Sequence, residues 1–203
     1  MEADTYLTIR TFSEGIYKEK GSRFLAIAAP VSSAEEIREI IGKIKKEHHS
    51  ARHHCYAWML GPDRQNWRVN DDGEPNGTAG KPILGQINSY VLTNILIVVT
   101  RWFGGKLLGT SGLINAYKTA AEDAIRHAEL IELTVQEHYE VSFPWTAMNV
   151  VMKLIKEENI EQSGQKFEDG CRMNISFRHS LHDRIIGALG RIEGLTYVYY
   201  GMD

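Results

Sequence analysis

Apolar residues recur along this chain either at every second position, as in strands, or at helical spacing. A long helical pattern stops near residues 130–137, and a self-contained pattern begins there. Beyond that point Tyr139, Val141 and Phe143 alternate with polar residues, which predicts a half-buried strand. Apolar residues then recur twice at helical spacing. The elements predicted in order are a strand at 139–143, a helix through 148–155, strands at 160–165 and 173–177 joined by a turn at Glu168-Asp169-Gly170, a helix through 185–192 and a strand at 197–200.

This βαββαβ order is the ferredoxin-like split pattern. We therefore predict a ferredoxin-like domain over residues 137–203. Residues 1–133 carry their own mixed pattern and are predicted to form a separate domain. The elements predicted there are strands at 6–11 and 23–31, a helix opened by the capping box Ser33–Glu36, strands at 54–60 and 67–69, a helix with Pro82 in its first turn, a strand at 94–102, and a helix that Thr110 or Ser111 caps and that reaches about Leu130. The fold class is α+β with two domains.

Composition narrows the class of protein. The 203 residues are 43% hydrophobic and 24% charged, close to the globular average, which excludes a largely disordered chain. The longest aliphatic run, Ile95–Val99, is too short to span a membrane, and no signal peptide is expected because the acidic, polar N-terminus lacks an apolar segment. With only two cysteines, far apart, a cytoplasmic location is expected.

Charge argues against binding through bulk electrostatics. Residues 1–133 carry 16 basic and 16 acidic side chains, and the remainder carries 7 and 10. Neither part is basic, so strong, sequence-independent attraction to nucleic acid is not expected. A local basic patch is still compatible with this charge balance.

Glycine is the most informative residue type. Eight of the 18 glycines lie between Gly73 and Gly112, mostly in two loops that each lead into a predicted helix. Free amides at a helix start form a generic anion site, whereas the alternative is tight turns that only glycine fits. The sharp turn after the buried strand should require positive φ, or leave no space for a Cβ, at Gly104 or Gly105. Neither loop is a Walker A motif or a dinucleotide fingerprint.

Arg101 ends the buried strand before the second loop. Its charge either pairs with a buried carboxylate, for which Asp71, Asp72 and Glu74 are candidates, or joins Lys106 in holding an anion flanked by His53 or His54. The predicted ligand-binding residues are Arg101, Lys106, Gly104, Gly105, Gly109, Thr110, Ser111, Gly112, His53, His54, Asp71, Asp72, Glu74 and Lys81. No catalytic residue and no metal ligand is assigned.

Histidine, cysteine and carboxylate clusters leave alternatives open. Half of the eight histidines lie within residues 48–54, beside Cys55. Zinc binding, a nucleophilic Cys55 and a purely structural role are all conceivable, and the structural role is favoured. The acidic group at 71–74 suits Mg²⁺, acid–base chemistry or an exposed turn, but it is not an EF-hand loop, because Pro82 occupies the position of the required glutamate.

A long, irregular set of motifs resembles the YigZ/IMPACT family over about residues 18–128. The motifs are Arg52-His53-His54-Cys55-Tyr56-Ala57-Trp58, Asp71-Asp72-Gly73-Glu74-Pro75, Gly77-Thr78-Ala79-Gly80-Lys81-Pro82-Ile83-Leu84, and the run from Ile95 through Thr100-Arg101-Trp102-Phe103-Gly104-Gly105-Lys106-Leu107-Leu108-Gly109. The second half matches the small C-terminal domain of bacterial members by pattern.

The resemblance implies both a fold and a role. The first domain would be ribosomal protein S-five domain 2-like, and the second would resemble the last domain of elongation factor G. Such a pair implies contact with ribosomes or RNA. Eukaryotic members restrain the kinase that phosphorylates an initiation factor, and they carry an extra N-terminal domain. About 17 residues precede the matching region here, so a bacterial-type member is expected.

Two functions follow as hypotheses. The leading one is a cytoplasmic, translation-linked regulator or binding protein whose glycine-rich, anion-binding face engages RNA, the ribosome or a protein partner. The alternative is a small enzyme that acts on a phosphorylated metabolite or nucleotide at the same face. No cofactor and no membrane association are expected in either case.

Overall fold

The computed structural model describes residues 4–167 and 170–203, and it divides the chain into two compact units. The N-terminal unit is Tyr6–Leu133; the C-terminal unit is Thr134–Asp203 together with Asp4 and Thr5. The predicted turn at Glu168-Asp169-Gly170 falls largely on residues 168–169, which lie outside the described residues. Each unit has its own hydrophobic core.

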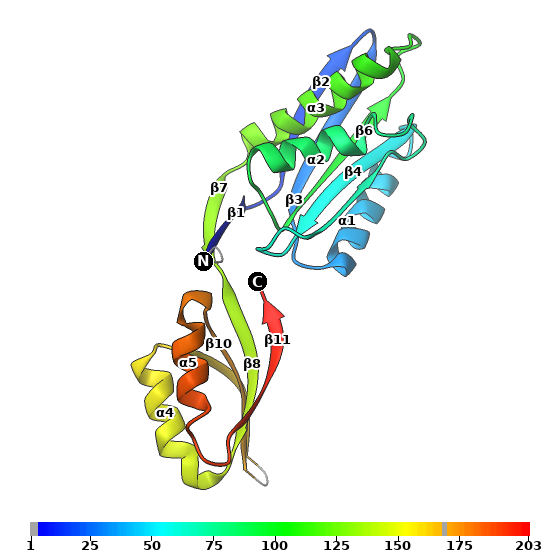
Figure 1. Cartoon of the computed structure of the whole chain (residues 1–203). Coiled ribbons are helices and arrows are strands. Elements are labelled where there is room, and N and C mark those ends of the chain that lie inside the picture. The colour runs from blue at the N-terminus through cyan, green and yellow to red at the C-terminus, as the bar shows by residue number, and fades with distance from the viewer. Residues whose placement is uncertain (1–3, 168–169) are drawn as a thin grey trace. The chain divides into compact units, whose positions relative to one another are not determined.

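A five-stranded antiparallel sheet forms the centre of the N-terminal unit (Figure 1). Its middle strand is the predicted apolar segment, of which seven of eight residues are buried. A strand buried on both faces needs cover on both sides, which explains its apolar run from Ile95 to Val99. The strands in spatial order are β2 (Ser13–Glu19), β3 (Ser22–Pro30), β6 (Ile95–Trp102), β4 (His53–Leu60) and β5 (Asn66–Asn70).

Helices cover both faces of this sheet (Figure 1). On one face lie α2 (Gly80–Ser89) and α3 (Gly109–His127), and the isoleucines of α2 and the alanines of α3 share one core with Ile95, Ile97 and Val99 of β6. On the other face lies α1 (Ala34–Glu47), which packs against Leu96 and Val98. Alternation along β4 and β6 therefore assigns each side chain to one helix layer or the other.

Two strands were not predicted. β2 carries Glu14, Lys18 and Glu19 and few apolar residues, so its hydrophobic signal is weak. β7 (Leu130–Thr134) pairs with β1 (Thr5–Ile9) in a separate two-stranded sheet, within the segment read as a boundary. β2 forms a hairpin with the neighbouring strand β3, and β7 pairs with residues far away in the sequence, so strand pairing rather than local pattern makes both strands.

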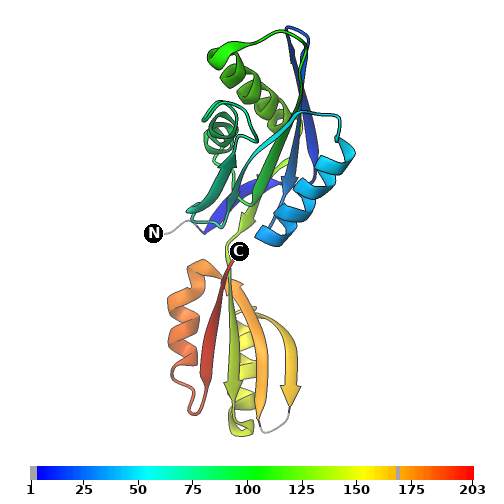
Figure 2. The same ribbon diagram turned by 90° about the vertical axis from the view of Figure 1, so that its right-hand side faces the viewer.

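The C-terminal unit has the predicted βαββαβ order, and α4 and α5 lie on one face of its sheet (Figure 2). The sheet order is β11-β8-β10-β9, with all pairs antiparallel. The elements are β8 (Gln136–Phe143), α4 (Met148–Glu157), β9 (Glu161–Phe167), β10 (Cys171–Arg178), α5 (His182–Leu189) and β11 (Thr196–Met202). The ferredoxin-like name itself stays a prediction.

Helix starts were predicted unevenly. The Ser33 hydroxyl accepts a hydrogen bond from the Glu36 amide at 3.2 Å, as the capping box predicts. The predicted cap of α3, Thr110 or Ser111, is wrong: the helix begins at Gly109, and its N-cap is Leu108, which makes no side-chain capping hydrogen bond. The first amides of α3 are therefore left without the hydroxyl cap expected from the sequence.

Gly104 and Gly105 meet the sequence prediction in different ways. A Cβ on Gly104 would lie 1.9 Å from the carbonyl carbon of Gly21, whereas Gly105 has φ +83° and open space around it. We expect Gly105→Ala to cost about 1 kcal/mol of unfolding free energy through backbone strain. Gly104→Ala should cost clearly more unfolding free energy, because the backbone of Gly21 and Ser22 must move to make room for the Cβ. Urea unfolding of both variants measures the difference, and equal losses would contradict the close approach.

Candidate functional site

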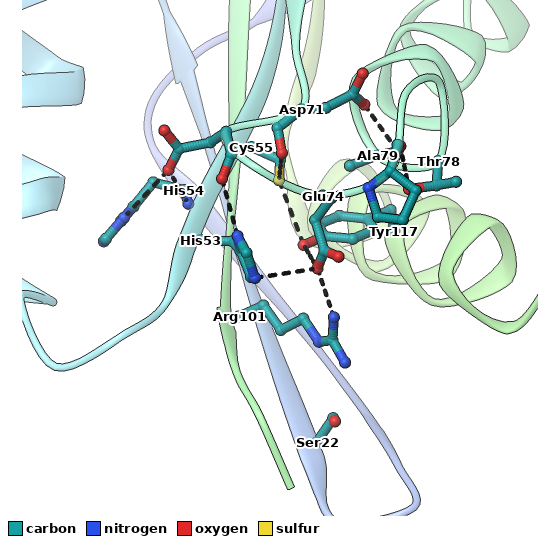
Figure 3. Close-up of polar contacts among 12 residues, drawn as sticks. Ser22, His53, His54, Cys55, Asp71, Glu74, Thr78, Ala79, Arg101 and Tyr117 are labelled. Atoms are coloured by element: carbon teal, nitrogen blue, oxygen red, sulfur yellow. Dashed lines mark hydrogen bonds and ion pairs between the residues drawn. The ribbon is translucent and has the colours of Figure 1, made fainter. Parts of the chain in front are cut away.

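A buried carboxylate lies at the centre of the candidate site, between the acidic loop and β6 (Figure 3). Glu74 Oε1 accepts hydrogen bonds from Arg101 Nη1 at 2.6 Å and from the Tyr117 hydroxyl at 2.8 Å. Only 4% of the Glu74 side chain and 6% of that of Arg101 is exposed. Of the two roles weighed for Arg101, pairing with a buried carboxylate is the one found. Its Nε is buried and has no hydrogen-bond partner among the described residues.

His53 is the histidine beside this ion pair. It lies opposite Arg101 in the register of β4 and β6, with Nε2 3.9 Å from Glu74 Oε1. Its Nδ1 lies 2.8 Å from the carbonyl oxygen of Asp72. A carbonyl oxygen only accepts, so Nδ1 carries the proton and donates it. In the neutral ring Nε2 then keeps its lone pair.

His54 points to the opposite face of the sheet. It is buried, and its Nε2 lies 3.2 Å from the carbonyl oxygen of His48, at the end of α1. Burial lowers the pKa of His54 from its ordinary value. Of the two histidines predicted to flank the site, the structure brings only His53 to it.

Asp71 and Asp72 organise their own loop. The Asp71 carboxylate accepts hydrogen bonds from the amides of Gly77, Ala79 and Gly80, at 2.8–3.1 Å, and so holds the start of α2. The Asp72 carboxylate accepts from the His54 amide at 2.7 Å. These bonds use the carboxylates structurally. The loop that these bonds hold together places Glu74 on the face of the sheet that α3 covers, where it meets Arg101 and Tyr117.

Cys55 is a core residue. Its Sγ lies 3.0 Å from the Asp71 carbonyl oxygen and 3.3 Å from the Tyr117 hydroxyl, and the residue is fully buried. Burial raises the pKa of the Cys55 thiol far above its ordinary value. A nucleophile needs accessible thiolate, so this environment favours the structural role over the nucleophilic one.

A pocket of about 420 Å³ opens beside the ion pair. Five predicted residues line it: His53, Glu74, Arg101, Gly109 and Thr110. Absent from the lining are Gly104, Gly105, Lys106, Ser111, Gly112, His54, Asp71, Asp72 and Lys81. Sequence reasoning missed the lining residues Arg52, Gly73, Pro75, Phe103, Leu107, Leu108 and Leu113. Arg52 adjoins the predicted site residue His53, and Phe103 adjoins Gly104. This adjacency is the sequence signal that could have identified them as lining residues.

The pocket combines positive groups with an uncapped helix start. Gly109 and Thr110 bring the first turn of α3 to its wall, and no side chain caps that turn. The exposed Arg52 and the paired Arg101 lie on the strand side. Free amides at the positive end of a helix dipole favour a bound anion, and guanidinium groups add directional donors. The arrangement is suited to holding one small oxyanion.

Residues 4–167 and 170–203 show no side-chain cluster for a metal ion and no helix that could span a membrane. No group of three or more His, Cys, Asp or Glu side chains there is arranged to hold a metal ion. None of the helices described is long and apolar enough to cross a membrane.

A second polar cluster, in the C-terminal unit, has no counterpart in the sequence predictions. The buried Glu137 carboxylate accepts hydrogen bonds from His179 Nδ1, from His182 Nδ1 at 2.8 Å and from the Tyr139 hydroxyl at 2.9 Å. Burial alone would raise the pKa of Glu137, but the hydrogen bonds from His182, His179 and Tyr139 outweigh it and lower the pKa. The charged carboxylate is therefore favoured in the folded state.

Comparison with known proteins identifies the family. Residues 20–125, more than half of the chain, match the Impact N-terminal domain. The chain belongs to the IMPACT family.

Relatives and a solved structure extend the match beyond that domain. The chain is 35% identical over 153 residues to the IMPACT family member YvyE of Bacillus subtilis, covering 75% of this chain and 70% of the relative. It is 41% identical over 128 residues to the IMPACT family member YigZ of Escherichia coli, covering 59% and 63%. A crystal structure described as that of a hypothetical protein aligns over 98% of both chains, with TM-score 0.76 and 26% identity.

Removing the cation of the buried pair should destabilise the N-terminal unit. Arg101→Met leaves the Glu74 charge buried without its partner, which costs about 3–5 kcal/mol of unfolding free energy. Adding Glu74→Gln removes that charge and keeps an acceptor for Tyr117, so the double variant should be more stable than Arg101→Met alone. Urea unfolding measures both. Losses that simply add in the double variant would contradict the coupling.

The lowered pKa of Glu137 predicts a pH-dependent contribution to stability. The carboxylate stabilises the fold above its unfolded pKa of about 4.3, and this contribution is lost as pH falls through the lower folded value. The stability gap between the parent and Glu137→Gln should therefore be widest near neutral pH and shrink below about pH 4.3. Urea titrations from pH 6 to 3 measure it, and a constant gap would contradict the assignment.

Proposed function

We propose that this protein is a cytoplasmic, translation-linked regulator that binds its partner through the pocket beside Glu74 and Arg101. The observation that carries this proposal is the uncapped start of α3, which opens on a pocket lined by Arg52, His53 and Arg101. In this proposal the pocket holds an oxyanion of the partner. The two domains are, in the same proposal, ribosomal protein S-five domain 2-like and ferredoxin-like.

Family membership supports the link to translation. The chain belongs to the IMPACT family, and the resemblance noted from its motifs implies control of translation by eukaryotic members. The proposed pair of folds is common among translation factors. Function still resides in the site rather than in the fold, so the pocket supplies the specific part of the proposal.

The chemistry of the pocket supports binding of one anionic group. Arg52 is exposed and lines the pocket, and Gly109 and Thr110, in the first turn of α3, line it as well. Lys106 is exposed in the loop just before the helix and adds positive charge nearby. The charge of Arg101 is already matched by Glu74 at 2.6 Å, so Arg101 contributes donors more than net charge.

An enzyme acting on a phosphorylated small molecule is the second candidate, and His53 favours it. The bond from Nδ1 to the Asp72 carbonyl leaves Nε2 as a base on the pocket wall. This candidate predicts release of inorganic phosphate from nucleotides or phosphomonoesters, and loss of that release in His53→Gln. Binding without any release would leave regulation as the function.

Ligand-induced stabilisation tests the anion site. Titration with phosphate, nucleotides and a short single-stranded RNA should raise Tm by about 3–6 °C at ten times Kd. Arg52→Ala together with Lys106→Ala should remove that increase, because both exposed cations near the pocket are gone, while the unliganded Tm stays within about 1 °C.

A matched pair of exposed lysines provides the control. Lys43→Ala with Lys118→Ala removes the same charge from surfaces outside the pocket lining, and this variant should respond as the parent does. No Tm shift in the parent with any of the three ligands, or an equal loss in the control pair, would refute the anion site.

A further inference from the structure

The pocket beside Glu74 has a polar half and an apolar half. The polar half is formed by Arg52, His53, Arg101 and the first turn of α3. The apolar half is formed by Pro75, Phe103, Leu107, Leu108 and Leu113. A site for a bare phosphate has no use for the second half, so the apolar wall requires its own explanation.

The apolar wall is exposed and held in place. Leu107 is 85% exposed and Phe103 is 44% exposed, although both line the pocket. The Arg101 guanidinium lies 5.7 Å from the centre of the Phe103 ring, a cation–π contact. The tight approach of Gly104 to Gly21 fixes the start of the loop. Phe103 and Leu107 therefore present apolar surface to solvent beside the polar half of the pocket.

The charge around the pocket disfavours a polyanion. Tight binding to nucleic acid needs many cationic contacts, because released counterions supply most of its affinity. Arg101 is neutralised by Glu74, the N-terminal unit is balanced in charge, and Arg52 is the exposed cation on the lining. One anion beside one apolar group matches this surface better than a phosphate chain.

We propose that the pocket binds a protein partner through a short acidic–apolar segment. A carboxylate of that segment accepts hydrogen bonds from Arg52 and the amides of Gly109 and Thr110. A large apolar side chain next to it packs on Phe103 and Leu107. Arg101, a residue that is 5% exposed, lines the same pocket, and its buried Nε has no hydrogen-bond partner among the described residues. This inference rests on the proposed function and names the class of partner.

Amide chemical shifts of the ¹⁵N-labelled full chain test the proposal. The probe is a terminally blocked peptide with adjacent leucine and aspartate between glycines, compared with versions in which leucine becomes glycine or aspartate becomes asparagine. The parent peptide should give saturable shifts at Gly109 and Thr110, with Kd of about 1 mM or below, and each altered peptide should bind at least about tenfold more weakly. A phosphoserine version tests whether phosphate replaces the carboxylate.

Leu107→Ser separates this inference from the proposed function. The side chain is 85% exposed, so the variant should fold normally. It should lose the tenfold preference for leucine over glycine and still bind inorganic phosphate as the parent does. The control, Ile16→Ser, changes an exposed apolar residue outside the pocket lining and should keep the preference.

The outcomes are distinct. Phosphate shifts without any leucine preference would overturn the acidic–apolar partner and leave the anion site standing. No shift at Gly109 and Thr110 with phosphate or peptide would overturn both. Single-stranded RNA that binds more tightly than the peptide, with no dependence on Leu107, would assign this face to nucleic acid and overturn the inference.

Discussion

A negative charge buried beneath the central sheet is the constraint on which the N-terminal unit depends. The Glu74 carboxylate lies in the interior, where an unpaired charge costs several kcal/mol, and the side chains around it are arranged to satisfy it. Arg101 supplies the opposite charge from β6, and Tyr117 supplies a hydroxyl from α3. The loop, the central strand and the long helix therefore meet at one carboxylate oxygen, and the pocket lies beside that junction.

The neighbouring polar groups follow from the same constraint. The acidic loop must place Glu74 under the sheet, and the Asp71 carboxylate folds it by accepting three amide hydrogen bonds. The His53 ring is oriented by the Asp72 carbonyl of that loop. The second glycine loop connects β6 to α3, and its Gly104 passes so close to the Gly21 backbone that no Cβ would fit there. Asp71, Asp72 and Gly104 thus shape the loops around the pocket without lining it themselves.

Local pattern predicted much of the fold because burial follows periodicity. The apolar run at residues 95–99, the alternation at Tyr139–Phe143 and the helical spacing through 148–155 each have one reading that buries the hydrophobic face. β2 was missed because its apolar content is low, and β7 because it lies in the segment read as a domain boundary. A hairpin with β3 makes β2, whereas pairing with the distant β1 makes β7. The start of α3 was misplaced because a hydroxyl near a helix start does not by itself form a cap.

The sequence alone determined the residue types of the candidate site and the family they resemble, because both lie in contiguous motifs. It left open which carboxylate Arg101 meets, since Asp71, Asp72 and Glu74 lie within four residues of one another and only their side-chain directions differ. Tertiary structure decided that Glu74 lies beneath the sheet, that His53 and not His54 faces the pocket, and that Leu107 and Phe103 form its open wall. The physical reason is that alternation assigns a side chain to a face of a strand, whereas its neighbours on that face come from other strands and helices.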